Sequence, residues 1–214
     1  MTRMFWVSAA LGLATLASAG PGLAGVTAPP PPPPSQSAST DAANSLSTAA
    51  SGNVGNSISP RAQACESASK FGDFNGVGID ECTVALRNPL LTVHDQATIY
   101  TDRGAIYMQH RMFKEAKADL DTAIQLDPNL ANAYINRGGV MIAQKRYADA
   151  ITDIDRGLAL NPDQPEKAYF NRAIADENLR DIKSAFADYT KASQLKPDWV
   201  APKTELARFS TKEQ

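Results

Sequence analysis

Apolar residues recur at intervals of three and four along two neighbouring segments of the chain, residues 131–144 and 147–160. This spacing puts them on one face of a helix, so each segment is predicted to be an amphipathic helix. Lys145 and Arg146 form a short turn between the segments, and Asn161-Pro162 stops the second one. Two helices joined by so short a link predict an antiparallel helical hairpin.

The same pattern recurs with an almost constant period. Five positions hold one residue type in three consecutive units, spaced by 34 and then by 35 residues: Tyr100, Tyr134 and Tyr169; Arg103, Arg137 and Arg172; Ala116, Ala150 and Ala185; Asp119, Asp153 and Asp188; Pro128, Pro162 and Pro197. A period of this size indicates a stacked array of hairpins. Stacking is required because a single hairpin cannot bury its apolar side.

The units read "AYINRGGVMIAQKRYADAITDIDRGLALNP" and close relatives, and over residues 97–199 they resemble the tetratricopeptide repeat family. Gly104 and Gly138 match the close-packing glycine of that family, whereas Ala173 departs from it. The resemblance implies an all-α solenoid, a right-handed superhelix of antiparallel helix pairs. It also implies a concave groove that binds peptides or partner proteins. The "NRG" at residues 136–138 is typical of a common subclass, here expected to be an exported bacterial protein.

A fourth, degenerate unit is predicted upstream, because "DECTVAL" (80–86) aligns with "ADLDTAI" (118–124). Counting back starts this unit near Ser59, with helices over about 61–70 and 78–87, and "FGDFNGVG" (71–78) is interpreted as the turn between them. Four extra residues before Ala97 are expected to lengthen a loop that holds His94. Downstream, residues 199–209 are predicted to form a capping helix, with Val200, Leu206 and Phe209 covering the open end.

The chain is therefore divided into a signal peptide (1–19), a Pro/Ser/Ala-rich arm (20–58), the degenerate hairpin (59–96), three repeats (97–130, 131–164 and 165–198), and a capping helix with its tail (199–214). Arg3, the apolar run 4–16 and Ala17-Ser18-Ala19 are typical of a cleaved signal. Cleavage after Ala24 and retention as a membrane anchor are the alternatives. We expect the mature protein to be periplasmic or secreted.

The arm contains an unbroken run of prolines, residues 29–34, and almost no large apolar residue follows it before residue 59. Such a composition cannot bury a core, so disorder is predicted. The proline run favours an extended polyproline II conformation. It serves as a spacer or as a docking ligand.

Each repeat places an arginine on the first helix and an aspartate sixteen residues later on the second. A charge in the seam of a hairpin is costly unless it is paired, and a guanidinium can donate two hydrogen bonds to one carboxylate. Three ion pairs are therefore predicted, Arg103 with Asp119, Arg137 with Asp153, and Arg172 with Asp188. The alternative is that these arginines bind an anionic ligand.

The degenerate unit has Cys65 at the position of the arginine and Cys82 one place beyond that of the aspartate. These are the two cysteines of the chain, the expected compartment is oxidising, and the register puts them on facing helices. A disulfide is predicted, which replaces the ion pair of the other units. Two free buried thiols are the alternative.

The formal net charge of −2 gives no excess of basic residues of the kind that binds nucleic acid. Neither His94 nor His110 belongs to a catalytic or zinc-binding pattern, and the cysteine spacing matches no zinc site. We predict no catalytic residues, no metal and no cofactor. An enzyme is the disfavoured alternative.

In the tetratricopeptide repeat family the first helices line the groove. By register the lining here comprises Thr101, Asp102 and Ala105; Asn132, Ile135 and Asn136; and Lys167, Phe170, Asn171 and Ile174. Asn136 and Lys167 match the set with which family members clamp a C-terminal carboxylate, but Thr101, Ala105 and Asn171 do not. We therefore expect an extended or helical peptide, with Asn136 and Asn171 holding its backbone and Ile135 and Phe170 packing a side chain. Alternatively, the asparagines only bond to neighbouring helices.

Two functions follow. The first is an adaptor or scaffold that binds a peptide or protein partner in the groove. The second is a structural or assembly component, a homo-oligomer or the subunit of an envelope complex, that uses its outer face or its Pro-rich arm. The sequence names neither the partner nor the oligomeric state.

Overall fold

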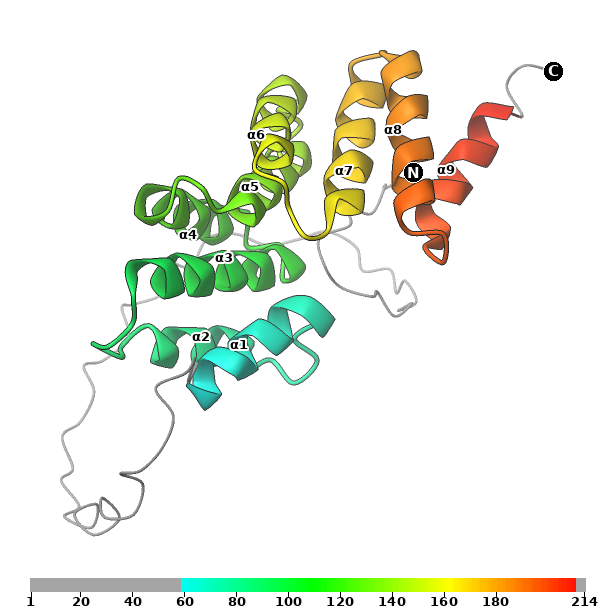
Figure 1. The fold of residues 1–214 in the computed structure, drawn as a ribbon. Coiled ribbons are helices and arrows are strands. Elements are labelled where there is room, and N and C mark those ends of the chain that lie inside the picture. The colour runs from blue at the N-terminus through cyan, green and yellow to red at the C-terminus, as the bar shows by residue number, and fades with distance from the viewer. Residues whose placement is uncertain (1–58, 211–214) are drawn as a thin grey trace, which may run out of the picture. The chain divides into compact units, whose positions relative to one another are not determined.

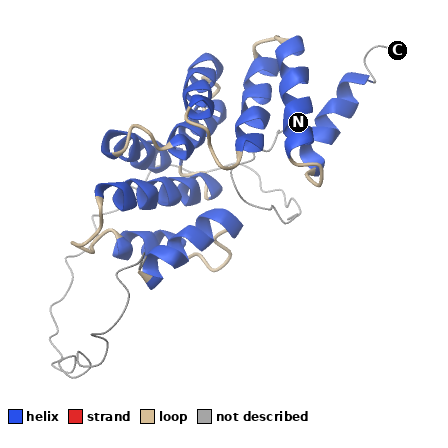
Figure 2. Ribbon diagram, in the orientation of Figure 1, coloured by secondary structure: helices blue, strands red, loops and turns tan. Residues whose placement is uncertain are grey.

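The computed structural model describes residues 59–210, and this part of the chain folds into nine helices without a strand (Figures 1 and 2). In order they are α1 (Pro60–Phe71), α2 (Gly78–Ala85), α3 (Val93–Gln109), α4 (Phe113–Leu126), α5 (Ala131–Ala143), α6 (Tyr147–Ala159), α7 (Pro165–Asn178), α8 (Ile182–Leu195) and α9 (Val200–Ser210). The predicted signal peptide, the whole of the arm and the last four residues lie outside the described residues.

The helices pair into four hairpins, α1 with α2, α3 with α4, α5 with α6 and α7 with α8, and consecutive hairpins pack on one another (Figure 1). The first helices also contact one another directly, α1 with α3, α3 with α5, and α5 with α7. These four helices therefore share one side of the stack, and that side is where a groove can form.

The three repeat hairpins turn in the same way. A residue in the left-handed region follows each first helix, and it is a basic residue each time: Arg111 (φ 60°), Lys145 (φ 63°) and Arg180 (φ 71°). The next amide then donates to the carbonyl five residues back, from Met112 to Tyr107, from Arg146 to Met141 and from Asp181 to Asp176, at 2.8–2.9 Å. Such a turn satisfies carbonyls that the helix end would leave unpaired. It holds the two helices of each repeat in the same geometry.

The prediction of a longer loop before α3 is wrong. The extra residues form an additional helical turn, because Thr92 and Asp95 make a capping box at the start of α3. His94 accordingly lies in the first turn of α3, where its Nδ1 is 2.7 Å from Asp127 Oδ2 at the end of α4.

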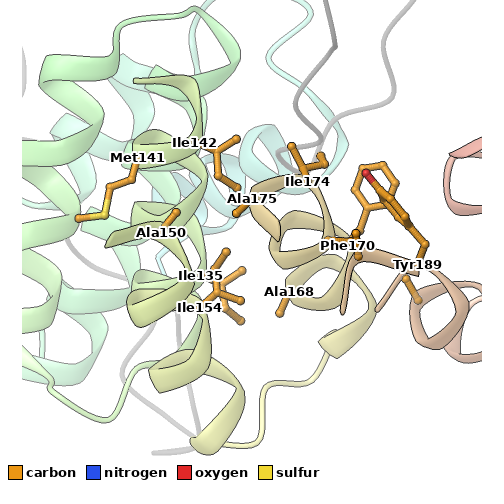
Figure 3. Close-up of a cluster of buried hydrophobic side chains, with 13 residues drawn as sticks. Ile135, Met141, Ile142, Ala150, Ile154, Ala168, Phe170, Ile174, Ala175 and Tyr189 are labelled. Carbon is orange, nitrogen blue, oxygen red and sulfur yellow. The ribbon is translucent and has the colours of Figure 1, made fainter. Parts of the chain in front are cut away.

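Small residues let the helices of a hairpin approach closely. A Cβ atom on Gly138 would lie 2.6 Å from Ile154 Cγ1, and one on Gly157 would lie 2.6 Å from Ile135 Cγ1. Ile135 and Ile154 lie together between α5 and α6 in Figure 3. The two glycines thus make room, from opposite helices, for the isoleucines that fill the core of the second repeat.

The C-terminal helix α9, together with Trp199 just before it, covers the exposed end of the last hairpin. Trp199, Ala201, Leu206 and Phe209 pack on the cluster around Phe170 and Tyr189. Val200 was expected to take part, but it is 68% exposed. Pro202, two positions further along α9, is fully buried. Arg208 Nη2 also binds Glu177 Oε1 at 3.0 Å, and Glu177 Oε2 accepts the Tyr189 hydroxyl at 3.2 Å.

In each repeat the structure brings the arginine and the aspartate together across the hairpin. Arg137 donates from Nε to Asp153 Oδ2 at 2.6 Å and from Nη2 to Asp153 Oδ1 at 2.8 Å. The other two pairs have the same two-pronged geometry, with distances of 2.6 and 2.9 Å for Arg103 with Asp119 and of 2.7 and 3.0 Å for Arg172 with Asp188. All three aspartates are buried, so the guanidinium compensates their charge where water does not.

A third N–H of each arginine reaches the preceding hairpin, which the sequence analysis did not foresee. In the preceding hairpin, Nη1 finds its acceptor two residues after the position that aligns with the paired aspartate. Arg103 donates to Thr83 Oγ1 at 2.9 Å, Arg137 to Asp121 Oδ1 at 2.8 Å, and Arg172 to Asp155 Oδ1 at 2.5 Å. The guanidinium also lies over the tyrosine three residues earlier, at 5.3–5.7 Å from the ring centroid. Each arginine therefore joins both helices of its own hairpin to the hairpin before it.

The degenerate hairpin is held together differently. Cys65 on α1 and Cys82 on α2 form a disulfide, and both are completely buried. An ion pair is present as well, because Arg61 binds Glu81, which aligns with the paired aspartates of the later units. Arg61 is largely exposed, so this ion pair lies at the surface while the disulfide occupies the core.

Replacing Arg137 by alanine should lower the free energy of unfolding by about 2–4 kcal/mol, because Asp153 would remain buried without its partner. Adding Asp153→Ala should recover part of this loss, as measured by denaturant unfolding in a double-mutant cycle. The exposed Arg146 is a suitable control, and Arg146→Ala should cost at most about 1 kcal/mol. A cycle without coupling energy between Arg137 and Asp153 would count against the pairing.

Thiol titration of the denatured, unreduced protein should find no free thiol. Reduction should then lower the free energy of unfolding by about 3 kcal/mol, the value expected for opening a loop of this length. The double variant Cys65→Ala, Cys82→Ala should show no response to reductant. Two titratable thiols before reduction would contradict the disulfide.

Candidate binding groove

A pocket of about 140 Å³ lies on the side that the first helices share. Residues from four helices and one loop line it: Ser69 and Lys70 of α1; Thr101, Asp102 and Ala105 of α3; Asn132, Ile135 and Asn136 of α5; Asp163 and Gln164 of the loop after α6; and Lys167 and Asn171 of α7. The pocket therefore spans all four hairpins, which are distant from one another in the sequence.

Most residues of the predicted groove are brought together here, but Phe170 and Ile174 are not. Both are buried, at 3% and 4% exposure. The Phe170 ring packs against Tyr189 of α8 and Trp199 before α9, with centroids 5.5 and 4.8 Å apart. Figure 3 shows Phe170 beside Tyr189. The expectation that Phe170 packs a ligand side chain is thus wrong, because the C-terminal cap already covers this ring.

Four lining residues were missed by the sequence analysis. Ser69 and Lys70 belong to the degenerate hairpin, whose weak similarity to the repeats gave no basis for assigning groove positions. Asp163 and Gln164 lie at the junction where the period lengthens from 34 to 35 residues. That irregularity was the available signal that this loop differs from the other junctions.

The floor of the pocket carries one polar residue from each repeat at equivalent positions, Asp102, Asn136 and Asn171. Asp102 Oδ1 accepts a hydrogen bond from the Ser69 hydroxyl at 2.6 Å, which ties α3 to α1. Burial raises the pKa of the Asp102 carboxyl to about 6, the Ser69 hydrogen bond opposes this, and the charge of Glu66 adds to it. Asp102 therefore changes its charge near neutral pH.

Two lysines also line the pocket, but each lies near a glutamate. Lys70 Nζ binds the Glu66 carboxylate, which raises the pKa of the lysine. Burial lowers the pKa of Lys167, while the charge of the neighbouring Glu166 opposes that shift. The basic side of the pocket is consequently neutralised by its own surroundings.

The two histidines take part in pairs outside the pocket. His94 lies against Asp127, and His110 Nε2 is 2.9 Å from Asp73 Oδ2. Within residues 59–210 no three His, Cys, Asp or Glu side chains gather closely enough to hold a metal ion. None of the helices in this range has the length and apolar character needed to cross a membrane.

Two family models, each described as tetratricopeptide repeat, match residues 107–170 and 166–198. No curated protein sequence matches the chain. Solved structures with the same helical arrangement include the tetratricopeptide repeat domain of Arabidopsis OM64, at 22% identity and a TM-score of 0.53, covering 56% of this chain and 99% of that one. MamA 41-end from Desulfovibrio magneticus RS-1 is similar at 17% identity and a TM-score of 0.54, covering 73% of this chain and 87% of that one.

A third structure is the first tetratricopeptide repeat of Spaghetti (RPAP3) bound to the HSP90 peptide SRMEEVD. It is 25% identical, has a TM-score of 0.52, and covers 56% of this chain and 94% of that one. These matches and the repeated hairpins confirm the predicted fold class. The described part of the chain is an all-α solenoid with the fold of tetratricopeptide repeat proteins.

Phe170→Ala should lower the free energy of unfolding by about 3–5 kcal/mol, because it empties a buried aromatic site between the last repeat and its cap. Phe71, which is 70% exposed at the end of α1, is the matched control, and Phe71→Ala should change stability by no more than about 0.5 kcal/mol. Denaturant unfolding measures both. Equal, small effects would show that Phe170 is not part of the packed core.

Proposed function

We propose that the protein is a non-catalytic adaptor or scaffold that binds a peptide or protein partner in the pocket between its first helices. The observation that carries this proposal is the composition of the pocket. Its floor offers the amides of Asn136 and Asn171 and the carboxyl of Asp102, groups that can pair with the N–H and C=O of a peptide backbone.

The structural similarities support the same function. The Spaghetti repeat is bound to a peptide, and it is similar to more than half of this chain. This likeness supports peptide binding as the activity for which the pocket should be tested.

We further propose that the protein is exported and acts in the periplasm or outside the cell. The basic, apolar and small-residue pattern of residues 1–19 supports this localisation. The buried disulfide supports it as well, because disulfides persist in oxidising compartments.

The assembly function through the outer face or the Pro-rich arm remains the competing hypothesis. It is separated from the groove hypothesis by variants that alter one surface and leave the other intact. Three lining residues suit this purpose because they are not packed in the core, namely Asn132, Asn136 and Lys167.

The triple variant Asn132→Ala, Asn136→Ala, Lys167→Ala should fold, as judged by circular dichroism, and should lose the partners that wild-type protein captures by cross-linking in its native envelope. The matched control replaces two amides and a lysine on or after α4, Lys114→Ala, Gln125→Ala and Asn129→Ala, all exposed. It should retain those partners. If the groove variant keeps every partner and deletion of residues 20–58 removes them, the assembly function holds instead.

A further inference from the structure

We propose that the pocket selects a peptide through a lysine or arginine side chain, and that Asp102 is the residue that recognises the positive charge. This inference rests on the proposed groove function and adds to it the chemical class of the partner. It differs from recognition of a C-terminal carboxylate, which would require a basic pocket.

The first reason is the hydrogen bonding of Asp102. Within the described residues its carboxylate receives one hydrogen bond, from the neutral hydroxyl of Ser69, and it lines the pocket. A carboxylate offers about four acceptor positions. An ammonium or guanidinium group entering the pocket would fill positions that Ser69 leaves open, and would do so through charge-assisted hydrogen bonds.

The second reason is the balance of charge around the pocket. The lining contains two lysines and two aspartates. Glu66 and Glu166 offset Lys70 and Lys167, respectively, as described above. Lys70 also acts on Asp102 and Asp163, and Lys196 lies close enough to Lys167 to act on it, so four carboxylates share three lysines and the net charge that an incoming side chain meets is negative.

The third reason is size. The volume of about 140 Å³ is close to the roughly 150 Å³ of an engineered cavity that holds a benzene molecule. The pocket can therefore accept one amino-acid side chain. Ile135 and Ala105 line its wall but are only 4% and 3% exposed, so the methylene groups of such a side chain would meet a small part of their surface and its charged end would lie against Asp102.

Binding should consequently depend on pH. The charged groups that act on Asp102 are Glu66 and Lys70 from α1, and Asp163 and Lys167 line the same pocket. Because burial raises the pKa of Asp102 to about 6, its carboxylate is ionised at pH 7.5 and mostly protonated at pH 5. A basic peptide should bind about ten-fold more weakly at pH 5 than at pH 7.5, since a lysine or arginine keeps its charge over this range.

The test is selection of random peptides displayed on phage against the full-length protein, followed by affinity measurements on synthetic copies of the selected peptides. We expect a lysine or arginine at one fixed position, and a rise in Kd of about ten-fold to a hundred-fold when that residue is replaced by glutamine. Asp102→Asn should cause a similar rise and should abolish the pH dependence. The control Asp80→Asn, an exposed carboxylate on α2, should change neither.

Should Asp102→Asn fail to fold, the pH dependence of the wild-type protein towards the lysine peptide and its glutamine copy decides the question. A loss of affinity at pH 5 that is confined to the lysine peptide supports the inference. Selected peptides that bind in the groove but are acidic or neutral at every position would overturn it while leaving the proposed function intact. If no peptide is enriched relative to a control surface without protein, this result overturns both the inference and the proposed groove function.

Discussion

The partly buried guanidinium of each repeat makes the interaction on which the arrangement of the hairpins depends. Its planar fork binds the aspartate of its own hairpin twice, and its remaining arm binds a hydroxyl or carboxylate of the hairpin before it. An aliphatic side chain in the same place would add apolar contact but no preferred rotation of one hairpin on the next. The arginine does impose one, because three of its N–H groups are directed at fixed acceptors in two different hairpins.

The groove follows from this same constraint. Each arginine is preceded in the chain by a residue of the groove floor, so that Asp102, Asn136 and Asn171 stand directly before Arg103, Arg137 and Arg172. Neighbouring residues of a helix project about 100° apart. When the arginine is held in the seam, the preceding side chain is turned towards the shared side of the first helices. The ion pairs that join the hairpins therefore also align the polar floor of the pocket.

The two ends of the array use other means, because a terminal hairpin lacks one neighbour. The first hairpin has a disulfide in its core where the later ones have the arginine. The last hairpin carries Glu177 at a position that is apolar in the earlier repeats, and this carboxylate joins α7 to Tyr189 of α8 and Arg208 of α9. The disulfide at one end and the Glu177 contacts at the other both limit fraying of a hairpin that is stacked on one side only.

The sequence by itself determined the helices, the repeat and the pairs within each hairpin, because these depend on local periodicity and on residues at a constant separation. It also indicated eight of the pocket residues through register, from Thr101 to Asn171. Only the tertiary structure decided the rest. The third bond of each arginine and the contribution of Ser69 and Lys70 join different hairpins, and the burial of Phe170 beneath Trp199 joins the last hairpin to its cap. Their geometry depends on how these parts pack. Periodicity along one chain determines which face of a helix is apolar, but not which neighbour covers it.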